Sequence, residues 1–238
     1  MGTVSRETLA ELAAEYDLPA SAAEQFGRIL EALAAEPDPH TTVSDPVRAL
    51  DVHLRDSLVA LAVPVLRDAE AVVDIGSGAG FPGLPLAVAL PGARFDLVES
   101  TSRKVAVIDH LAAVAGLANV RPVHARVEEW GLPDAGRAAY DVATARAVAP
   151  LAVLAEYAAP LLRPGGEFIA WKGAASVDEV AAGATAAAAL GLQAQDPLPV
   201  TPYSGARDLH LYLYWKVGET PARYPRRSGI AAKRPLGA

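Results

Sequence analysis

The sequence predicts an α/β fold in which a Rossmann-like, mixed but mostly parallel sheet follows a helical N-terminal segment. Three observations lead to this prediction. Roughly the first 65 residues carry apolar side chains at helical spacing. From residue 71 onward, short apolar runs alternate with helical stretches, which is typical of right-handed crossovers in a parallel sheet. A glycine-rich loop stands directly after the first of these runs.

Three helices are expected in the N-terminal segment. Apolar residues recur every three or four positions over residues 9–16 and again over 26–33. The Glu-Pro-Asp-Pro stretch at 36–39 should end the second helix, because a residue before proline disfavours the α conformation. Asp45 can cap a third helix that has proline at its first position and runs over residues 46–61.

Six apolar runs are predicted as strands. The last run is aromatic-rich and no helix precedes it closely, so we expect it to be an added antiparallel strand. The six runs are residues 72–75, 94–98, 120–123, 140–143, 167–171 and 209–215. Helices are expected at 84–90, 102–115, 151–162 and 177–190. We therefore divide the chain into a helical cap (1–65), a sheet domain (66–217) and a basic tail (218–238).

Composition excludes several kinds of site. The 238 residues include no cysteine, which excludes a disulfide scaffold, a thiolate zinc site and a cysteine nucleophile, and we expect no metal. The N-terminus lacks the apolar core of a signal peptide, and no run approaches the roughly 18 apolar residues that span a bilayer. These features predict a cytoplasmic protein without a membrane partner.

Charge is distributed unevenly along the chain. The net charge is −7, which argues mildly against nucleic-acid binding, although contact with phosphate depends on where the cations lie. After residue 215 the only acid is Glu219, and the basic residues are Lys216, Arg223, Arg226, Arg227, Lys233 and Arg234. This basic end is either a solvated extension or a surface for phosphate.

The glycine-rich loop reads Asp74-x-Gly76-x-Gly78-x-Gly80 between a predicted strand and a predicted helix. Glycines there let the backbone turn tightly and approach a ligand. A dinucleotide fold would place its third glycine at position 81, which is Phe81 here. Asp74 suits a cationic amino-acid group better than a pyrophosphate. A second acid, Glu99, ends the next strand, where it can accept both hydroxyls of a ribose. These features favour S-adenosylmethionine over a dinucleotide.

Two further groups of candidates follow the third and fourth predicted strands. Arg126, Val127 and Glu128 stand where adenine would be bound, although Arg126 and Glu128 could equally form a surface ion pair. Arg146 follows the fourth strand, where methyltransferases hold the acceptor. A buried arginine is costly unless it is paired, so Arg146 belongs either to the site or to a structural ion pair. We expect the site role, and therefore little change in stability when Arg146 is removed.

On the third predicted helix, His53, Asp56 and Ser57 are spaced i, i+3 and i+4, so they share one face. A polar helix face is the simpler interpretation of this spacing.

Some methyl acceptors are disfavoured by absent motifs. Amino-group methyltransferases usually carry an Asn/Asp-Pro-Pro-aromatic loop after the fourth strand, whereas this chain reads Arg-Ala-Val-Ala-Pro over 146–150. Pyrimidine carbon-5 enzymes need a cysteine. A ring nitrogen with a free lone pair needs neither device, because it has no proton to lose; it needs alignment and nearby positive charge.

The sequence resembles the bacterial small-subunit rRNA guanine-N7 methyltransferase family, also called glucose-inhibited division protein B. The most specific matches are the loop Asp-Ile-Gly-Ser-Gly-Ala-Gly-Phe-Pro-Gly-Leu-Pro at 74–85 and Tyr-Pro-Arg-Arg at 224–227. The other matching pieces are 53–58, Glu99-Ser100 with Lys104, 126–128, Arg146, 164–166 and 233–236.

The resemblance implies a class I S-adenosylmethionine methyltransferase with a seven-stranded sheet, and methylation of one guanine in the 530 loop of 16S rRNA, a loop linked to streptomycin sensitivity. The substrate would be the rRNA itself, a precursor or the small ribosomal subunit. Arg146 and Lys104 would orient RNA or offset charge, with no general base. With the glycine loop, the candidate cofactor residues are Asp74, Gly76, Gly78, Phe81, Glu99, Ser100, Thr101, Arg126, Val127, Glu128 and Arg146. The candidate RNA contacts are His53, Arg55, Lys104, Arg226, Arg227, Lys233 and Arg234.

Two alternatives remain open from the sequence. One is a small-molecule methyltransferase, which the acidic net charge favours and the basic tail disfavours. The other is a cofactor-binding partner of the ribosome that transfers no methyl group.

Overall fold

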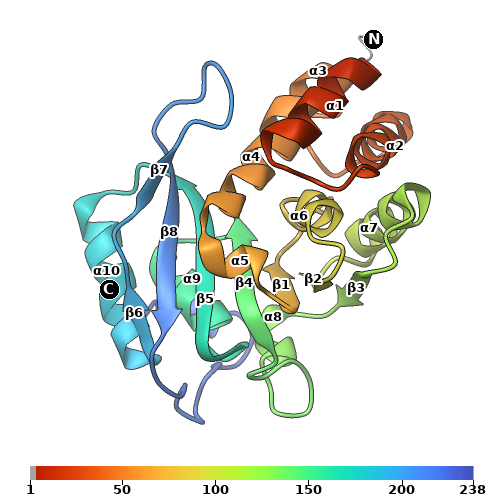
Figure 1. Ribbon diagram of the computed structural model, residues 1–238. Coiled ribbons are helices and arrows are strands. Elements are labelled where there is room, and N and C mark those ends of the chain that lie inside the picture. Colours follow the sequence, from red (N-terminus) through yellow and green to blue (C-terminus); the bar gives the residue numbers. More distant parts are fainter. Residues whose placement is uncertain (1–3, 238) are drawn as a thin grey trace.

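A mixed sheet of eight strands lies between two layers of helices in the computed structural model, which describes residues 4–237 (Figure 1). The strand order is β3-β2-β1-β4-β5-β8-β6, with β7 also paired to β8. Strands β1 to β5 are parallel, whereas β8 is antiparallel to β5, and β6 and β7 are antiparallel to β8. The strands are β1 (Ala71–Ile75), β2 (Arg94–Glu99), β3 (Val120–His124), β4 (Tyr140–Arg146), β5 (Leu162–Gly173), β6 (Leu192–Ala194), β7 (Leu198–Val200) and β8 (Leu209–Lys216).

The mixed sheet and its antiparallel last strand are confirmed. All six predicted runs form strands, and two further three-residue strands, β6 and β7, join β8 and bring the count to eight, one more than the expected seven. Such short pieces have no alternation long enough to read from sequence. The predicted helix at 151–162 ends at Ala158, and β5 already begins at Leu162.

Helices cover both faces of the sheet and enclose two apolar cores. One core joins the N-terminal helices, α6 (Gly83–Ala89) and α7 (Ser102–Ala115) to one face. The other core lies on the opposite face, with α9 (Leu151–Ala158) and α10 (Val177–Ala189). The short helices α8 (Val127–Trp130) and α11 (Ile230–Lys233) pack at the edge of this second core.

The first two helices form as their periodicity predicts. Helix α1 (Arg6–Glu15) packs on α2 (Ala22–Ala35), and α2 packs on α6 and α7. The buried residues Phe26, Ile29 and Leu33 recur at helical spacing on α2. Burial of this stripe attaches the N-terminal helices to the sheet domain.

The third predicted helix is a series of short helical segments. It contains α3 (Pro46–Ala49), the π-helix η1 (Leu50–Arg55), α4 (Asp56–Leu58) and the 3₁₀-helix η2 (Val59–Ala62), and α5 (Pro64–Arg67) follows. In the π segment, the N–H of Asp56 bonds to the carbonyl of Asp51, five residues earlier. Single wide turns of this kind are frequent at functional sites. The predicted helical run over 46–61 therefore forms, but not as one regular α-helix; within it, the carbonyls of Val52 and Asp56 accept hydrogen bonds from Arg146 of β4 and Trp171 of β5.

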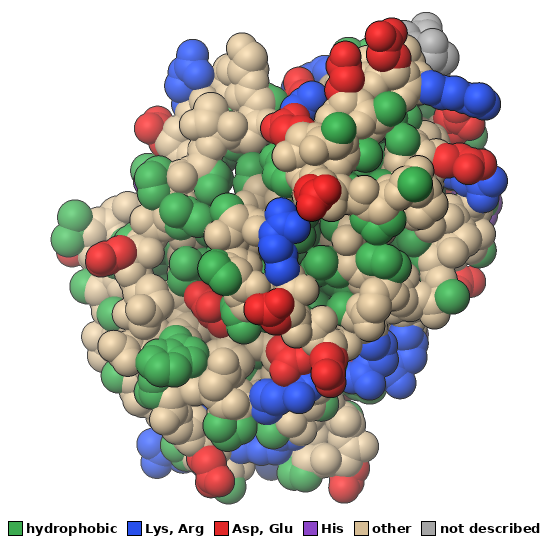
Figure 2. Space-filling model, viewed as in Figure 1, with side chains coloured by type: hydrophobic (Ala, Val, Ile, Leu, Met, Phe, Trp, Pro, Cys, Tyr) green, Lys and Arg blue, Asp and Glu red, His purple; other side chains and the backbone are tan. Residues whose placement is uncertain are grey.

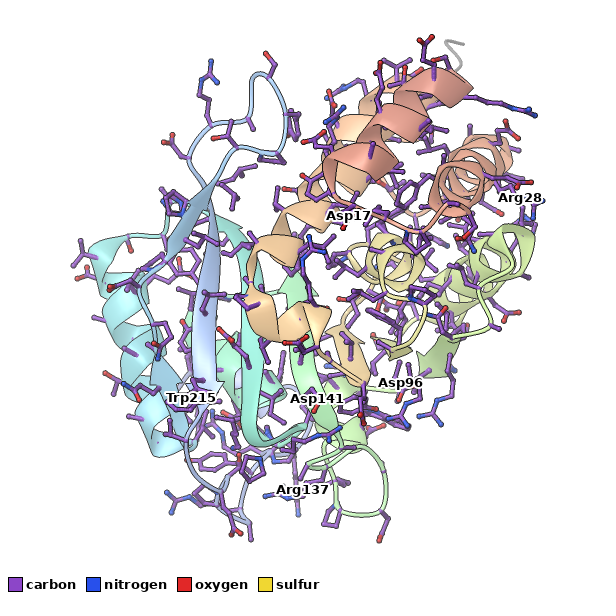
Figure 3. The ribbon with its side chains drawn as sticks, in the orientation of Figure 1. Asp17, Arg28, Asp96, Arg137, Asp141 and Trp215 are labelled. Carbon is purple, nitrogen blue, oxygen red and sulfur yellow. The ribbon has the colours of Figure 1, made fainter. Side chains whose placement is uncertain are left out.

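Charged networks hold the amino-terminal edge of the parallel strands together (Figure 3). The fully buried Asp96 accepts two hydrogen bonds from Arg121, both 2.7 Å long, and one from the Tyr140 hydroxyl. Asp141 accepts hydrogen bonds from the backbone N–H of residues 70 and 71, and it pairs with Arg163 at 2.9 Å. These groups satisfy one another, so we interpret this edge as structural.

The C-terminal tail is docked on the molecule. Arg226 forms a two-pronged ion pair with Glu156 of α9, a residue that is only 1% exposed. Arg137 donates to the carbonyls of Thr220 and Tyr224, both at 2.7 Å. Both the tail and the N-terminal helices therefore pack on the sheet domain, and the division of the chain at residues 65 and 217 stays a prediction.

Within residues 4–237, no helix combines the length and the apolar character that crossing a bilayer requires.

The Arg226–Glu156 pair should contribute strongly to stability. Arg226→Ala would leave a buried carboxylate without its partner, which typically costs about 3–5 kcal/mol; we expect about 3 kcal/mol because Arg226 is partly open to solvent. Arg227→Ala is the matched control, since Arg227 has no ion pair among the described residues, and it should change stability by less than about 0.5 kcal/mol. Urea unfolding measures both. Equal stability of the two variants would show that the pair does not hold the tail.

Candidate functional site

The glycine-rich loop after β1 leaves open space at one position. Gly76, Gly78 and Gly80 all have positive φ angles, a region that favours glycine. A Cβ on Gly76 would lie 2.9 Å from Val148, and one on Gly80 would lie 2.4 Å from Leu84. A Cβ on Gly78 would meet no atom within 4 Å. Gly76 and Gly80 therefore allow close packing of the protein, whereas Gly78 borders space that a ligand can fill.

Asp74 lies under this loop and is fully buried. One carboxylate oxygen accepts a hydrogen bond from the Thr144 hydroxyl at 2.8 Å, and the other accepts from the backbone N–H of Gly83 at 3.2 Å. Burial raises the pKa of Asp74 to about 6, although these hydrogen bonds oppose the shift. The side chain ties β1 to β4 and to the start of α6. This arrangement argues against the predicted contact between Asp74 and a cationic ligand group.

Glu99 ends β2 and lies beside the open side of the loop. Its Oε2 accepts from the backbone N–H of Gly78 at 3.1 Å, and its Oε1 accepts from that of Thr101 at 2.9 Å. The Ser100 hydroxyl lies 3.4 Å from Oε1, and the Lys104 ammonium lies 3.9 Å from Oε2. The loop and the residues after β2 therefore fix this carboxylate next to the space at Gly78, where it can accept ligand hydroxyls.

A small cavity of about 140 Å³ lies where the ends of β1, β2 and β3 meet. Its walls include Gly76 from the loop, Ser100 after β2, and residues 125–128 after β3. Val98 and Val127 add apolar surface that suits a flat ring. The structure thus brings together candidates that lie up to 52 positions apart (from 76 to 128) in the sequence.

Glu128 takes part in both arrangements that the sequence left open. It lines the small cavity, and its Oε2 lies 3.7 Å from Nε of Arg126. Its Oε1 also accepts from the backbone N–H of Gly229 at 2.7 Å, so the docked tail reaches the edge of the cavity. Nothing in the sequence indicated this last contact.

Arg146 ends β4 and is paired. Its Nη1 donates to Oδ2 of Asp56 at 2.7 Å and to the carbonyl of Val52 at 3.0 Å. The two side chains of the pair are 15% and 14% exposed. Burial raises the pKa of Asp56, and the guanidinium of Arg146 opposes that shift. Because removal of Arg146 would leave Asp56 unpaired, the expectation that stability would hardly change has no support in the structure.

His53 and Ser57 do not form the polar face that their spacing suggested, since both are buried. The His53 ring stacks on Phe81, with centroids 4.3 Å apart, and its Nε2 donates to the carbonyl of Val43 at 2.8 Å. Burial, together with Arg146, lowers the pKa of His53 to about 4, so the ring is neutral at pH 7. This burial argues against the predicted contact of His53 with RNA. Phe81 does not line the small cavity. Its ring lies near Arg146 instead, with 6.0 Å between the ring centroid and the guanidinium carbon.

A second, larger cavity of about 570 Å³ opens behind Arg146. Its walls include Asp56, Arg146, Pro150 and Trp171. Val148 lines both cavities, so the loop over residues 146–150 separates them. Trp171 and the other β5 and β8 residues at this cavity were not among the sequence-based candidates, because their apolar runs indicated only a strand.

Arg55 and Lys104 do not line either cavity, whereas Arg126 lines the small one. Arg55 pairs with Glu15 at 2.8 Å, and Lys104 and Arg126 are partly exposed near Glu99 and Glu128. On the face shown in Figure 2, basic and acidic side chains are mixed, with no continuous basic surface. No cluster of three or more His, Asp or Glu side chains that could hold a metal ion occurs in the part of the chain that the structure describes.

Comparison with known proteins gives a family match over most of the chain. The family model described as rRNA small subunit methyltransferase G (GidB) matches residues 24–200. Curated relatives that match carry the name Ribosomal RNA small subunit methyltransferase G, and two of them illustrate the likeness. The protein of Synechococcus elongatus is 42% identical over 200 residues, which cover 83% of this chain and 82% of that protein. The protein of Rubrobacter xylanophilus is 45% identical over 195 residues, which cover 81% of this chain and 75% of that protein.

A solved structure shares the fold. The S-adenosylmethionine-dependent O-methyltransferase of Thermotoga maritima superposes with a TM-score of 0.55 at 16% identity, covering 74% of this chain and 71% of that one. This likeness confirms the predicted fold class, a class I methyltransferase fold.

Substitution of Gly78 should block cofactor binding. The side chain in Gly78→Val would enter the open space next to Glu99, and we expect the affinity for S-adenosylmethionine to fall at least about tenfold. Gly116→Val is the matched control, because Gly116 also has a positive φ and open surroundings but lies at the end of α7. Both variants carry the left-handed strain of roughly 1–2 kcal/mol. Calorimetric titration compares them, and wild-type affinity in Gly78→Val would place the cofactor elsewhere.

Proposed function

Since the chain belongs to the rRNA small subunit methyltransferase G family, we propose that it methylates ring nitrogen 7 of one guanine in the 530 loop of 16S rRNA. The chain is an S-adenosylmethionine-dependent methyltransferase of small-subunit rRNA. The proposal of guanine N7 as the methylated atom rests on the family match over residues 24–200. The matched segment includes Arg146 and the loop over residues 146–150 that separates the two cavities.

The cofactor is assigned to the small cavity and the adjoining space at Gly78. Support comes from the chemistry of the walls: the Glu99 carboxylate is fixed where it can accept ribose hydroxyls, and the apolar surface around Val127 suits adenine. Ser100 and Thr101 hold the turn after Glu99. S-adenosylmethionine supplies a methyl group on a sulfonium, which is electrophilic. The backbone at Gly78 lets such a ligand approach closely.

The acceptor needs alignment and no general base. Guanine N7 carries a lone pair and no proton, so no group of the protein has to remove one. The candidate catalytic residues Arg146 and Lys104 are both cations, and neither is suited to act as a base. Arg146 faces the large cavity, where its guanidinium can orient the base. The loop over residues 146–150 places this cavity next to the cofactor cavity.

RNA contacts are assigned to cations that the protein does not already use. Arg227, Lys233 and Arg234 of the tail have no ion pair among the described residues, whereas Arg226 is committed to Glu156 and Arg55 to Glu15. We assign the substrate to the small subunit or a precursor in the cytoplasm. The net charge of −7 is the one observation that favours a small-molecule methyltransferase instead.

Methyl transfer to unmodified small subunits tests the function. Incubation with labelled S-adenosylmethionine should place one methyl group per 16S rRNA, and chemical cleavage at 7-methylguanine should map it to a single guanine of the 530 loop. Label on a small molecule but not on rRNA would favour the alternative enzyme. Ribosome binding without any transfer would identify a non-catalytic partner.

The tail cations should make the affinity for RNA depend on salt. Each phosphate contact adds about 0.7–0.9 to the slope of log affinity against log salt. Replacing Arg227, Lys233 and Arg234 by alanine should therefore flatten the slope by about 2.1–2.7. Arg28→Ala is the control, because Arg28 lies on α2, far from the tail in Figure 3, and pairs with Glu24. If the triple variant kept the wild-type slope and affinity, the tail would not contact RNA.

A further inference from the structure

The Asp56–Arg146 pair leaves hydrogen-bonding groups unused at the wall of the large cavity. Only Nη1 of Arg146 donates to a described residue, so Nε and Nη2 have no acceptor among residues 4–237. On Asp56, Oδ2 accepts from Arg146, and Oδ1 has no donor among the same residues. Oδ1 of Asp56 is also accessible from outside the protein. Among the described residues, the only side-chain atom that is both fully buried and without a hydrogen-bond partner is Nδ1 of His53.

These groups are fixed in position although they are incompletely paired. The Trp171 indole donates to the backbone carbonyl of Asp56 at 2.7 Å, and the wide turn of η1 leaves the Val52 carbonyl to accept from Arg146. A mostly buried carboxylate with one oxygen that has no donor is costly for the folded protein. Such an arrangement is expected where a ligand completes the hydrogen bonds.

The pair presents an acceptor next to a donor, and guanine presents the complementary order. Along one edge guanine has the O6 acceptor, then the N1–H donor, then the N2 amino donor. Adenine has a donor, N6, where guanine has O6, and an acceptor at N1. An arginine facing O6 and a carboxylate facing N1–H and N2–H thus satisfy guanine. With adenine, the arginine would face the N6 amino donor and the carboxylate would face the N1 acceptor, so neither could form its hydrogen bond.

We propose that Asp56 and Arg146 recognise this edge of the target guanine, with Asp56 as the residue that specifies guanine. The proposal rests on the function proposed above and deepens it. Arg146 donates to O6, and the Asp56 carboxylate accepts from N1–H and from the N2 amino group.

The position of the large cavity agrees with the reacting atom. Its volume of about 570 Å³ lies within the range of roughly 300–1,000 Å³ that is common for ligand sites. N7 lies on the same side of the purine as O6, so a base held by Arg146 keeps N7 near the end of β4. From there the loop containing Val148 leads to the cofactor cavity.

The test compares guanine with inosine, which lacks only the N2 amino group. Small subunits are reconstituted with 16S rRNA that carries guanine or inosine at the mapped nucleotide, and kcat/KM is measured on both. For the wild-type protein we expect inosine to lower kcat/KM about 10- to 100-fold, the usual discrimination of a good bidentate contact. For Asp56→Asn, kcat/KM on the guanine substrate should fall by a similar factor, and kcat/KM on the inosine substrate should be no lower than that on the guanine substrate.

This comparison separates recognition of guanine from a merely structural role of Asp56. If Asp56 only holds Arg146, the effects of Asp56→Asn and of inosine should multiply, and that result would overturn the proposal. Asp51→Asn, in the adjoining π-helix η1, is the matched control, because Asp51 pairs with Arg55 and does not line the cavity; it should keep the wild-type preference. The affinity of Asp56→Asn for S-adenosylmethionine should be unchanged in calorimetry.

Measurements on the wild-type protein alone also test the recognition of guanine, even if Asp56→Asn folds poorly. Equal methylation of guanine and inosine by the wild-type protein would refute recognition by Asp56 and leave the proposed function intact. No methylation of the guanine substrate would refute the proposed function itself.

Discussion

The ion pair between Arg146 and Asp56 is the interaction on which the arrangement of the site depends. It joins the carboxyl end of β4, in the centre of the sheet, to the N-terminal helical segment, and Trp171 of β5 adds a second connection to the same residue. A regular helix would use the Val52 carbonyl internally; the π turn leaves it for Arg146. Asp56, from the N-terminal helical segment, thereby becomes part of the wall of the large cavity.

Two cavities on either side of a single loop give the chemistry its geometry. The loop over residues 146–150 lies between the pocket assigned to the cofactor and the pocket assigned to the base, and Val148 contacts both. Gly76 permits this arrangement, because any larger residue would collide with Val148. Transfer to a ring nitrogen depends mainly on such alignment, since no proton has to be moved at the acceptor.

The basic residues at the C-terminal end of the chain do not all have the same role. The chain is acidic overall, and its basic end suggested a single cationic surface. The structure divides that end: Arg226 neutralises the buried Glu156, and Lys216 is buried against the carbonyl of Leu190, whereas Arg227 and Lys233 remain without an ion pair among the described residues. Burial also lowers the pKa of Lys216 to about 8. Part of the tail therefore stabilises the fold, and only the rest is available for phosphate.

The sequence by itself determined the features that local physics encodes. Apolar spacing predicted α7 with the bounds Ser102–Ala115, and the spacing of the glycines matches the positive φ angles at Gly76, Gly78 and Gly80. Only the tertiary structure decided which charges meet. Asp56 and Arg146 are 90 positions apart, and Glu156 and Arg226 are 70 apart. A side chain that looks solvent-exposed in a helical pattern, such as Asp56, becomes mostly buried because other elements pack over it. Periodicity cannot show this, since pairing depends on which surfaces come together when the sheet and helices pack.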